Sequence, residues 1–149
     1  MTLLPRAARF ALMATLDVSL HARGRPVPSK ALAARHDLPP RRLETLLQAL
    51  VRGGILRSAR GPAGGYELAR ERRRLGLGEI VRVALHAEEE EEGAPSGPRL
   101  LEAVLGPVVV QAEATMLAKL DEMTLDDLHT LALSSGFGAN EDADGDFAI

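Results

Sequence analysis

The sequence of 149 residues contains no cysteine and no tryptophan, and aromatic residues make up only 3% of it. The absence of cysteine excludes disulfides, thiolate catalysis, zinc fingers and cysteine-ligated clusters, and it is in keeping with a cytoplasmic location. With so few aromatic side chains, the core must consist of leucine, valine and alanine, which suits helices. We expect no stretch long enough to span a bilayer, and therefore no membrane partner. Asp17 interrupts the apolar run 10–16, which favours a helix of the folded domain over a signal peptide.

Positive and negative charges are segregated along the chain. Residues 1–85 hold sixteen Arg or Lys and six Asp or Glu, whereas residues 86–149 hold two Arg or Lys and fifteen Asp or Glu. This asymmetry indicates a basic module that binds a polyanion, followed by an acidic remainder. The basic residues fall at particular helix positions, which argues against an arginine-rich surface that is merely solvated.

Three helices are predicted within the basic part. The first covers 6–20 and carries an apolar stripe that should face the core. The second covers 30–36, with Ser29 as its N-cap. A tight turn at 37–39 leads into the third helix, 40–52, which begins with a proline that pre-sets its first turn. The apolar stripe of the first helix consists of Phe10, Met13, Leu16 and Leu20.

The third helix has the clearest pattern in the sequence. Four leucines follow the i, i+3, i+4, i+7 spacing of a buried helix face. The opposite face is polar, as a helix that enters the major groove of DNA requires, because Arg can read guanine, Gln adenine and Thr a thymine methyl. Arg42 and Glu44 flank this polar face. The leucine face consists of Leu43, Leu46, Leu47 and Leu50, and the polar face of Arg41, Thr45, Gln48 and Arg52.

A glycine-rich hairpin is predicted after the third helix. Strand candidates 55–59 and 66–68 flank a turn at 61–65, and Arg60 opens that turn. A hairpin in this position is the wing of a winged helix-turn-helix, and an arginine at its tip can enter a narrow minor groove. The glycines could instead form a nucleotide-phosphate loop, but the run lacks the Gly-Lys-Ser/Thr ending and a βαβ context. A further short helix is expected at 77–85.

The acidic remainder divides into three predicted parts. Residues 86–98 should form an acidic flexible linker, 99–134 dimerisation helices interrupted near Gly106, and 135–149 a disordered acidic tail. The long helix is apolar on two sides, so we expect one side to pack against its own body and the other against a partner helix. Thr124 is expected to cap the last helix. The predicted dimer interface consists of Leu101, Val104, Leu105, Val108, Ala112 and Met116.

Three stretches of the sequence carry a family resemblance. They are residues 9–70, residues 75–85 and the segment MTLDDL, and the most specific part is RGPAGGYEL placed after ILRSA. Over residues 2–134 the chain resembles the Rrf2 family of bacterial transcription regulators, of the IscR, NsrR and CymR type. The resemblance implies a mainly α fold. It comprises a winged helix-turn-helix domain over residues 1–85, a small β-hairpin wing and a long C-terminal dimerisation helix.

The resemblance also implies roles for individual residues. Glu44 belongs to a Leu-Glu pair that matches the family's recognition helix, so it becomes a candidate for contacting cytosine. Arg60 matches the wing arginine that enters the minor groove, and Arg41 matches a position near the bases. Arg42 and Thr45 differ from the residues that the family has at these positions. We expect these differences to affect which operator sequence is bound, but not whether DNA is bound. The candidate DNA contacts are Ser29, Lys30, Arg41, Arg42, Glu44, Thr45, Gln48, Arg52 and Arg60.

Family members that sense iron, nitric oxide or redox state hold a [2Fe–2S] cluster on three cysteines of the linker. Because this chain has no cysteine, it is expected to be a cluster-less member without a cofactor. No metal site is predicted, because no two histidines are spaced i, i+3 or i, i+4, and surface or loop positions are expected for all of them. The histidines are His21, His36, His86 and His129.

The predicted function is that of a sequence-specific DNA-binding transcription regulator, acting as a homodimer on a palindromic operator. No catalytic constellation is present, so no enzyme activity is expected. One alternative is a protein-interaction regulator, whose activity is set by a regulatory protein partner docking on the acidic C-terminal half. A third hypothesis is a metal or redox sensor with ligands other than cysteine.

Overall fold

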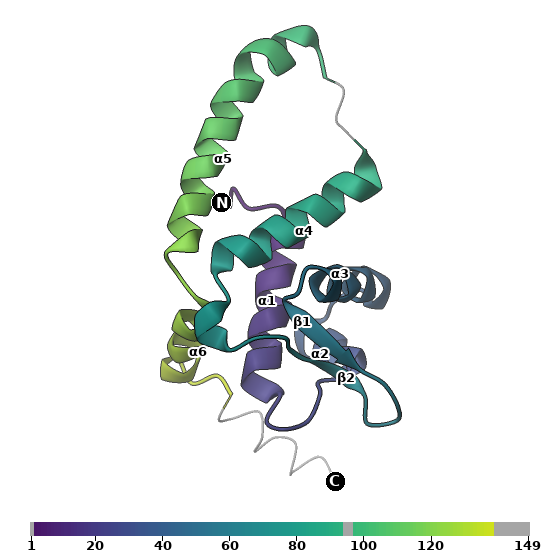
Figure 1. Ribbon diagram of the computed structural model, residues 1–149. Coiled ribbons are helices and arrows are strands. Elements are labelled where there is room, and N and C mark those ends of the chain that lie inside the picture. Colours follow the sequence, from purple (N-terminus) through teal and green to yellow (C-terminus); the bar gives the residue numbers. More distant parts are fainter. Residues whose placement is uncertain (1, 94–96, 139–149) are drawn as a thin grey trace.

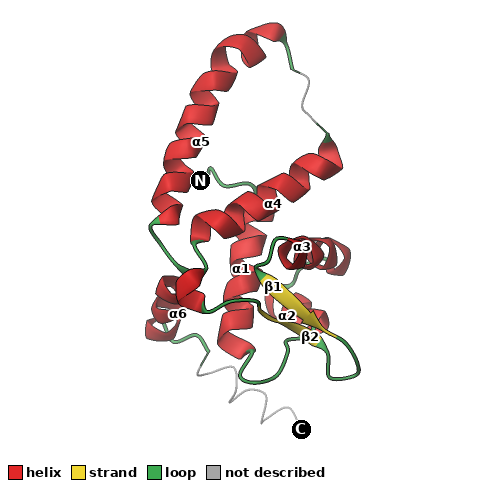
Figure 2. Ribbon diagram, viewed as in Figure 1, coloured by secondary structure: helices red, strands yellow, loops and turns green. Residues whose placement is uncertain are grey.

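The computed structural model describes residues 2–93 and 97–138, and helices account for most of them (Figure 1, Figure 2). Within these residues the sheet is a two-stranded antiparallel hairpin. The predicted fold class, mainly α with a small hairpin and a long C-terminal helix, is confirmed. The elements in chain order are α1 (Arg6–His21), α2 (Ser29–His36), α3 (Pro40–Arg52), β1 (Leu56–Ala59), β2 (Gly65–Leu68), η1 (Arg72–Arg74), α4 (Leu77–Glu92), η2 (Leu101–Leu105), α5 (Gly106–Asp121) and α6 (Leu125–Ser134).

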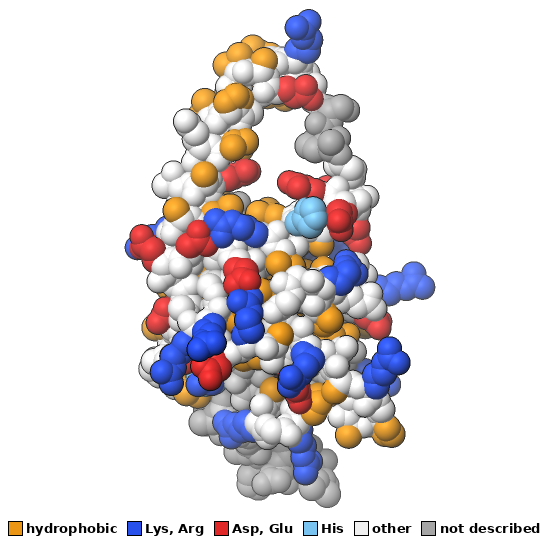
Figure 3. All heavy atoms as spheres, in the orientation of Figure 1, with side chains coloured by type: hydrophobic (Ala, Val, Ile, Leu, Met, Phe, Trp, Pro, Cys, Tyr) orange, Lys and Arg blue, Asp and Glu red, His pale blue; other side chains and the backbone are white. Residues whose placement is uncertain are grey.

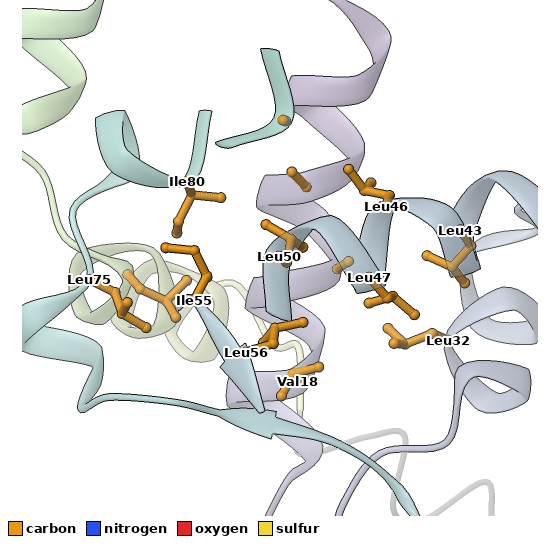
Figure 4. Close-up of a cluster of buried hydrophobic side chains, with 14 of the residues drawn as sticks. Val18, Leu32, Leu43, Leu46, Leu47, Leu50, Ile55, Leu56, Leu75 and Ile80 are labelled. Carbon is orange, nitrogen blue, oxygen red and sulfur yellow. The ribbon is translucent and has the colours of Figure 1, made fainter. Parts of the chain in front are cut away.

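The core forms where α1, α2, α3 and the first half of α4 meet (Figure 4). The four leucines predicted on the inner face of α3 are only 0% to 8% exposed. Figure 4 shows them beside Val18 of α1 and Leu32 of α2. Burying each leucine contributes about 1.5–3 kcal/mol. The leucine face therefore fixes α3 against the body and turns its polar face outward.

The buried face of α1 differs from the predicted apolar stripe. Of the four stripe residues, only Leu20 is buried, whereas Phe10, Met13 and Leu16 are half-buried. Helix α1 lies in the middle of the body and packs against α3, α4, α6 and β2. Small side chains face these neighbours because they allow helices to approach closely. The fully buried small apolar residues of α1 are Ala8, Ala11 and Ala14.

The turn between α2 and α3 agrees with the sequence, but the expected cap of α2 does not. Ser29 is the first residue of α2, and no side chain caps the helix. Instead, the backbone carbonyl of Pro28 accepts from the N–H groups of Ala31 (3.1 Å) and Leu32 (3.3 Å). Asp37 adopts a left-handed conformation with φ of 50° and ends α2. The tight turn therefore leads directly into the proline that begins α3.

The hairpin is fastened to the loop between α1 and α2. Val27 pairs with Tyr66 of β2, because each backbone N–H donates to the other's carbonyl at 2.9 and 2.8 Å. Gly65 is needed at the start of β2, since a Cβ there would lie 2.4 Å from the carbonyl oxygen of Val27. The wing thus has a fixed position relative to the helices.

Helix α4 is longer than the sequence predicted. It extends from Leu77 through Glu92, so residues 86–92 of the expected flexible linker form its last turns. Glutamate has a high helix propensity, and His86 lies 3.3 Å from the carboxylate of Glu90 one turn later. The acidic run 88–92 is therefore held at a defined place in the fold.

Elements η2 and α5 form an arm that projects from the body (Figure 1). The predicted interruption near Gly106 is present as the π-helical turn η2, next to Pro107, which lacks the N–H that a regular helix needs. The expectation that one side of this helix packs on its own body is wrong for most of its length. No residue of η2 or α5 is buried, and Figure 3 shows hydrophobic side chains along the arm. An opening separates the outer part of the arm from the end of α4, whereas the base of α5 contacts α4.

The arm also overturns the expectation that no segment could span a bilayer. Residues Leu101–Asp121 form 21 helical residues that contain an 18-residue window with a mean hydropathy of 1.3, so the helix is long and apolar enough to cross a membrane by length and composition alone. This helix contains Glu102 and Glu113 and is still apolar on average. Carboxylates at bilayer depth are unfavourable. Buried core helices of soluble proteins can be as long and apolar, but none of the apolar window of this helix is buried.

Helix α6 begins with the predicted cap. The Thr124 hydroxyl accepts from the backbone N–H of Asp127 (3.3 Å), and the Asp127 carboxylate accepts from the backbone N–H of Thr124 (2.8 Å). After α6, the backbone N–H of Phe137 donates to the carbonyl of Ala132 at 3.0 Å. Most of the predicted tail 135–149 lies outside the described residues.

Candidate nucleic-acid interface

Helix α3 presents a continuous polar face to solvent. Its six polar side chains are all exposed, namely the four of the predicted polar face and the two predicted to flank it. The Thr45 hydroxyl donates to the Arg41 carbonyl one turn earlier (3.0 Å), which leaves its methyl group pointing away from that bond. The exposed polar residues of α3 are Arg41, Arg42, Glu44, Thr45, Gln48 and Arg52.

Helix α2 and the hairpin lie on the same side of α1 as α3, whereas α5 and α6 lie on the other (Figure 1). At the start of α2, Lys30 is exposed and Ser29 is half-buried. Arg60 is exposed at the end of β1, next to Gly61, whose φ of +102° makes the turn possible. The structure thus brings the start of α2, the outer face of α3 and the wing together on one side of the molecule.

A buried carboxylate that sequence reasoning missed holds α2 in place. Asp17 of α1, whose side chain is 1% exposed, accepts from Arg35 through both oxygens (2.6 and 2.8 Å) and from His36 Nε2 (2.6 Å). His21 Nδ1 lies 3.3 Å from the same carboxylate. Burial alone would raise the pKa of Asp17, but the hydrogen bonds from Arg35 and His36 outweigh it and lower this pKa. An aspartate within an otherwise apolar helix was the sequence feature that could have indicated this buried ion pair.

The expectation that the histidines occupy plain surface or loop positions is therefore wrong for most of them. His21 and His36 belong to the Asp17 cluster, and His129 of α6 lies 2.8 Å from the Arg72 guanidinium and 3.1 Å from the Ser19 hydroxyl. Burial and the Arg72 charge lower the pKa of His129. Only His86 is highly exposed, with 73% of its side chain accessible.

The basic residues differ in whether a carboxylate of the protein itself neutralises them. Several arginines outside the outer face of α3 are neutralised by carboxylates of the protein itself. Within residues 2–93 and 97–138, the cations of the candidate interface have no such partner, so their charge is available to an external anion. The neutralised pairs are Arg35–Asp17, Arg57–Glu67, Arg70–Glu79, Arg72–Asp126 and Arg82–Asp121. The cations of the candidate interface without an ion pair are Lys30, Arg41, Arg42, Arg52 and Arg60, and described arginines elsewhere, such as Arg9 and Arg73, share this property.

Tyr66 of β2 lies near Glu44 of α3. Burial, together with the nearby Glu44 carboxylate, raises the pKa of Tyr66. Glu44 is therefore close to the hairpin as well as exposed on α3. Arg57 and Glu67 face each other across the strands and form an ion pair of 2.6 Å. Helix α3 also packs against β1, which gives the wing and α3 a common orientation.

A short helix, a tight turn, a polar-faced second helix and a glycine-rich hairpin define a winged helix-turn-helix. This is the fold of DNA-binding transcription regulators. Residues 4–130 match the family model described as "Rrf2: Iron-dependent Transcriptional regulator". The chain belongs to the Rrf2 family, and it is a transcription regulator rather than an enzyme.

Known proteins of the family are similar over much of the chain. "Protein rrf2" of Nitratidesulfovibrio vulgaris is 30% identical over 124 residues, which cover 81% of this chain and 83% of that protein. The regulator IscR of Xenorhabdus nematophila is 34% identical over 98 residues, or 62% of this chain and 60% of IscR.

Solved structures show the same fold. T. potens IscR superimposes with a TM-score of 0.65 at 29% identity, covering 88% of both chains. The B. subtilis cysteine regulator CymR gives a TM-score of 0.64 at 24% identity, covering 88% of this chain and 98% of CymR. The latter comparison supports the fold alone.

The iron dependence in the family description does not fit the donor set of this chain. The sequence has no cysteine, so a cysteine-ligated cluster cannot be held. In the described part of the chain, no group of three or more His, Asp or Glu side chains is arranged to bind a metal ion. The chain therefore departs from the cluster-binding members of its family.

Proposed function

We propose that this chain acts as a homodimer that binds a palindromic operator, with α3 in the major groove and the wing at the minor groove. The observation that carries the proposal is the exposed polar face of α3, fixed from behind by buried leucines and surrounded by cations without ion pairs. Such cations neutralise phosphates and release counterions. A cytoplasmic location and residues 1–85 as the DNA-binding domain belong to the same proposal.

The side chains of α3 suit different parts of the base edges. Arg41 can donate two hydrogen bonds to guanine, Gln48 can pair with adenine, and the Thr45 methyl can contact thymine. Glu44 can accept from the amino group of cytosine. Arg42, Arg52, Lys30 and Ser29 are suited to phosphate contacts, and Arg60 to the minor groove.

The arm supplies the proposed dimer contact. Leu101, Val104, Leu105 and Val108 are 46% to 61% exposed, and Ala112 and Met116 continue the same stripe toward the body. Exposed apolar surface of this extent is typical of a protein–protein interface. A palindromic site requires two recognition helices about 34 Å apart, which a two-fold dimer provides. We therefore propose a second copy, rather than a bilayer, as the cover of the arm.

The DNA proposal is tested with duplexes that the purified protein selects from a random library. We expect affinity to fall steeply with salt, since several phosphates are contacted. Arg41→Ala and Arg60→Ala should each weaken specific binding by about 1–3 kcal/mol in fluorescence anisotropy. Arg82→Ala is the matched control, because it removes the same charge from an arginine already paired with Asp121. Undiminished binding by both interface variants would refute the site assignment.

The dimer proposal is tested by sedimentation in detergent-free buffer. Leu105→Asp places a charge in the proposed interface and should convert the dimer into monomer. Leu133→Asp is the control, because Leu133 of α6 is exposed to the same extent, 48%. If the unmodified protein is monomeric, or dissolves only with detergent or lipid, a second copy does not cover the arm.

A further inference from the structure

A hollow of about 300 Å³ lies where the start of α1, the first turns of α3 and the end of α4 meet. This volume is at the lower end of the range of small-molecule sites. Phe10 and Leu46 contribute apolar surface to it. The charged residues that line the hollow are Arg6, Arg41, Arg42, Glu88, Glu91 and Glu92.

The two sets of charges face one hollow without neutralising each other. Among the described residues, no ion pair joins any of the three arginines to any of the three glutamates. The Arg6 guanidinium lies over the Phe10 ring, 5.5 Å from its centre. On the same acidic run, the glutamate that does pair is Glu90, which contacts His86 and does not line the hollow. A ligand with one charge would be attracted by one wall and repelled by the other, whereas a ligand with both charges would be attracted by both.

We propose that the hollow binds a small zwitterion of the amino-acid type. Its carboxylate would accept from Arg41 and Arg42, and its ammonium group would donate to Glu88 and Glu91. An apolar side chain would contact Phe10. Three carboxylates are enough to hold one ammonium group, and the arginines offer several donors for one carboxylate.

The site would act as an effector site, a step that rests on the proposed function. Arg41 and Arg42 line the hollow and also belong to the proposed DNA-binding face. A bound carboxylate takes the donors that DNA would use, so the ligand and DNA compete for the same groups. Occupation of the hollow then releases the operator.

Ligand binding is tested first without DNA, by calorimetric titration of the full chain with L-leucine, L-methionine and L-phenylalanine. We expect at least one of them to bind. Its single-charge analogues, for leucine 4-methylpentanoate and 3-methylbutylamine, should bind about tenfold more weakly or not at all, because each loses a charge-assisted contact. Absence of binding by all three amino acids at millimolar concentration, or equal binding by the analogues, overturns the proposal.

Two double variants then locate the site. Glu88→Gln/Glu91→Gln removes two carboxylates from the hollow, and Glu89→Gln/Glu90→Gln removes two neighbours that do not line it, with the same change in net charge. We expect the first to lose about tenfold or more in amino-acid affinity and the second to keep it. Equal losses of amino-acid affinity in the two variants would show that the amino acid does not bind in the hollow. Circular dichroism checks that both variants remain folded.

Competition is measured by anisotropy with the selected operator. The amino acid that binds should raise the Kd for DNA in the unmodified protein and in the Glu89→Gln/Glu90→Gln variant, but not in the Glu88→Gln/Glu91→Gln variant. Amino-acid binding with an unchanged Kd for DNA overturns the effector role. A protein that binds no DNA at all refutes the proposed function, while the calorimetric result still decides the binding site.

Discussion

Replacing Asp17 by Asn should destabilise the protein far more than a typical loss of an ion pair. Asp17 is buried and accepts hydrogen bonds from Arg35 and His36, so it joins α1 to α2. Removing one partner of a buried ion pair costs about 3–5 kcal/mol where the other partner stays buried. Here the Arg35 and His36 side chains are 25% and 24% exposed and can regain water. We therefore expect a loss of about 2–3 kcal/mol.

For a chain of this length, such a loss corresponds to a fall in Tm of about 5–10 °C. Urea unfolding at neutral pH measures the free energy directly. The matched control is Asp121→Asn, because Asp121 also accepts two hydrogen bonds from one arginine, Arg82, at 2.5 and 2.9 Å. That pair is exposed (Arg82 50%, Asp121 43%), so its loss should have little effect. Equal losses in the two variants would show that burial of Asp17 is not the cause.

The pH dependence gives an independent check on the same residue. The pKa of Asp17 is lowered in the folded protein, so its stabilising contribution is present above the ordinary value of 3.8 and is lost as pH falls through the lower, folded value. The difference in unfolding free energy between the unmodified protein and Asp17→Asn should therefore be full at about pH 5 and shrink in stronger acid. A difference that grows on acidification would contradict the assigned shift.

Two further substitutions test how the wing and the last helix are held. Gly65→Ala should destabilise the fold by about 1–3 kcal/mol in urea unfolding, because the new Cβ would meet the Val27 carbonyl, whereas Gly76→Ala, with no atom within 4 Å of its Cβ, should not. Thr124→Ala should cost about 1 kcal/mol by removing the capping box of α6, with the exposed Thr130→Ala in the same helix as control. If Gly76→Ala lost as much stability as Gly65→Ala, the clash with Val27 would not be the cause. If Thr130→Ala lost as much as Thr124→Ala, the capping box would not be the cause.

The recognition helix could be predicted from the sequence because all the information lies within its own 13 residues. Leucine spacing fixes which face is buried, and the opposite face is then exposed by geometry. Proline at its start and glycine after its end mark its bounds. The positions of individual contacts on DNA do not follow from the same pattern, and they remain predictions.

Sequence patterns failed where the deciding partner is distant along the chain. The face that α1 buries depends on how closely α4 approaches it, which favours alanine over the larger Phe10 and Met13. Asp17 finds its partners in the next helix, eighteen and nineteen residues away. Neither a periodicity nor a local motif carries such a pairing, although an aspartate in an apolar helix indicates that a partner is required.

The acidic run 88–92 shows that charge composition alone does not predict secondary structure. Composition indicated a solvated linker, and the charge pattern is compatible with one, but glutamates also propagate a helix that has already begun. Helix α4 is started by its buried residues Leu77, Ile80 and Val81, and it continues into the acidic run. Charge alone therefore cannot distinguish a linker from the exposed end of a packed helix.

Helix α4 contacts or adjoins three parts of the molecule, namely α3, the hollow and the arm. Its first turns pack in the core beside α3, its last turns line the hollow next to Arg41, and the arm follows a few residues later. A shift at the end of α4 would therefore reach both the recognition helix and the proposed dimer contact. Among the described residues no side chain of the arm is buried, and the base of α5 contacts α4 through the Arg82–Asp121 ion pair, so a partner bound to the arm would also act on α4. Operator affinity and self-association should consequently change together when the hollow is occupied.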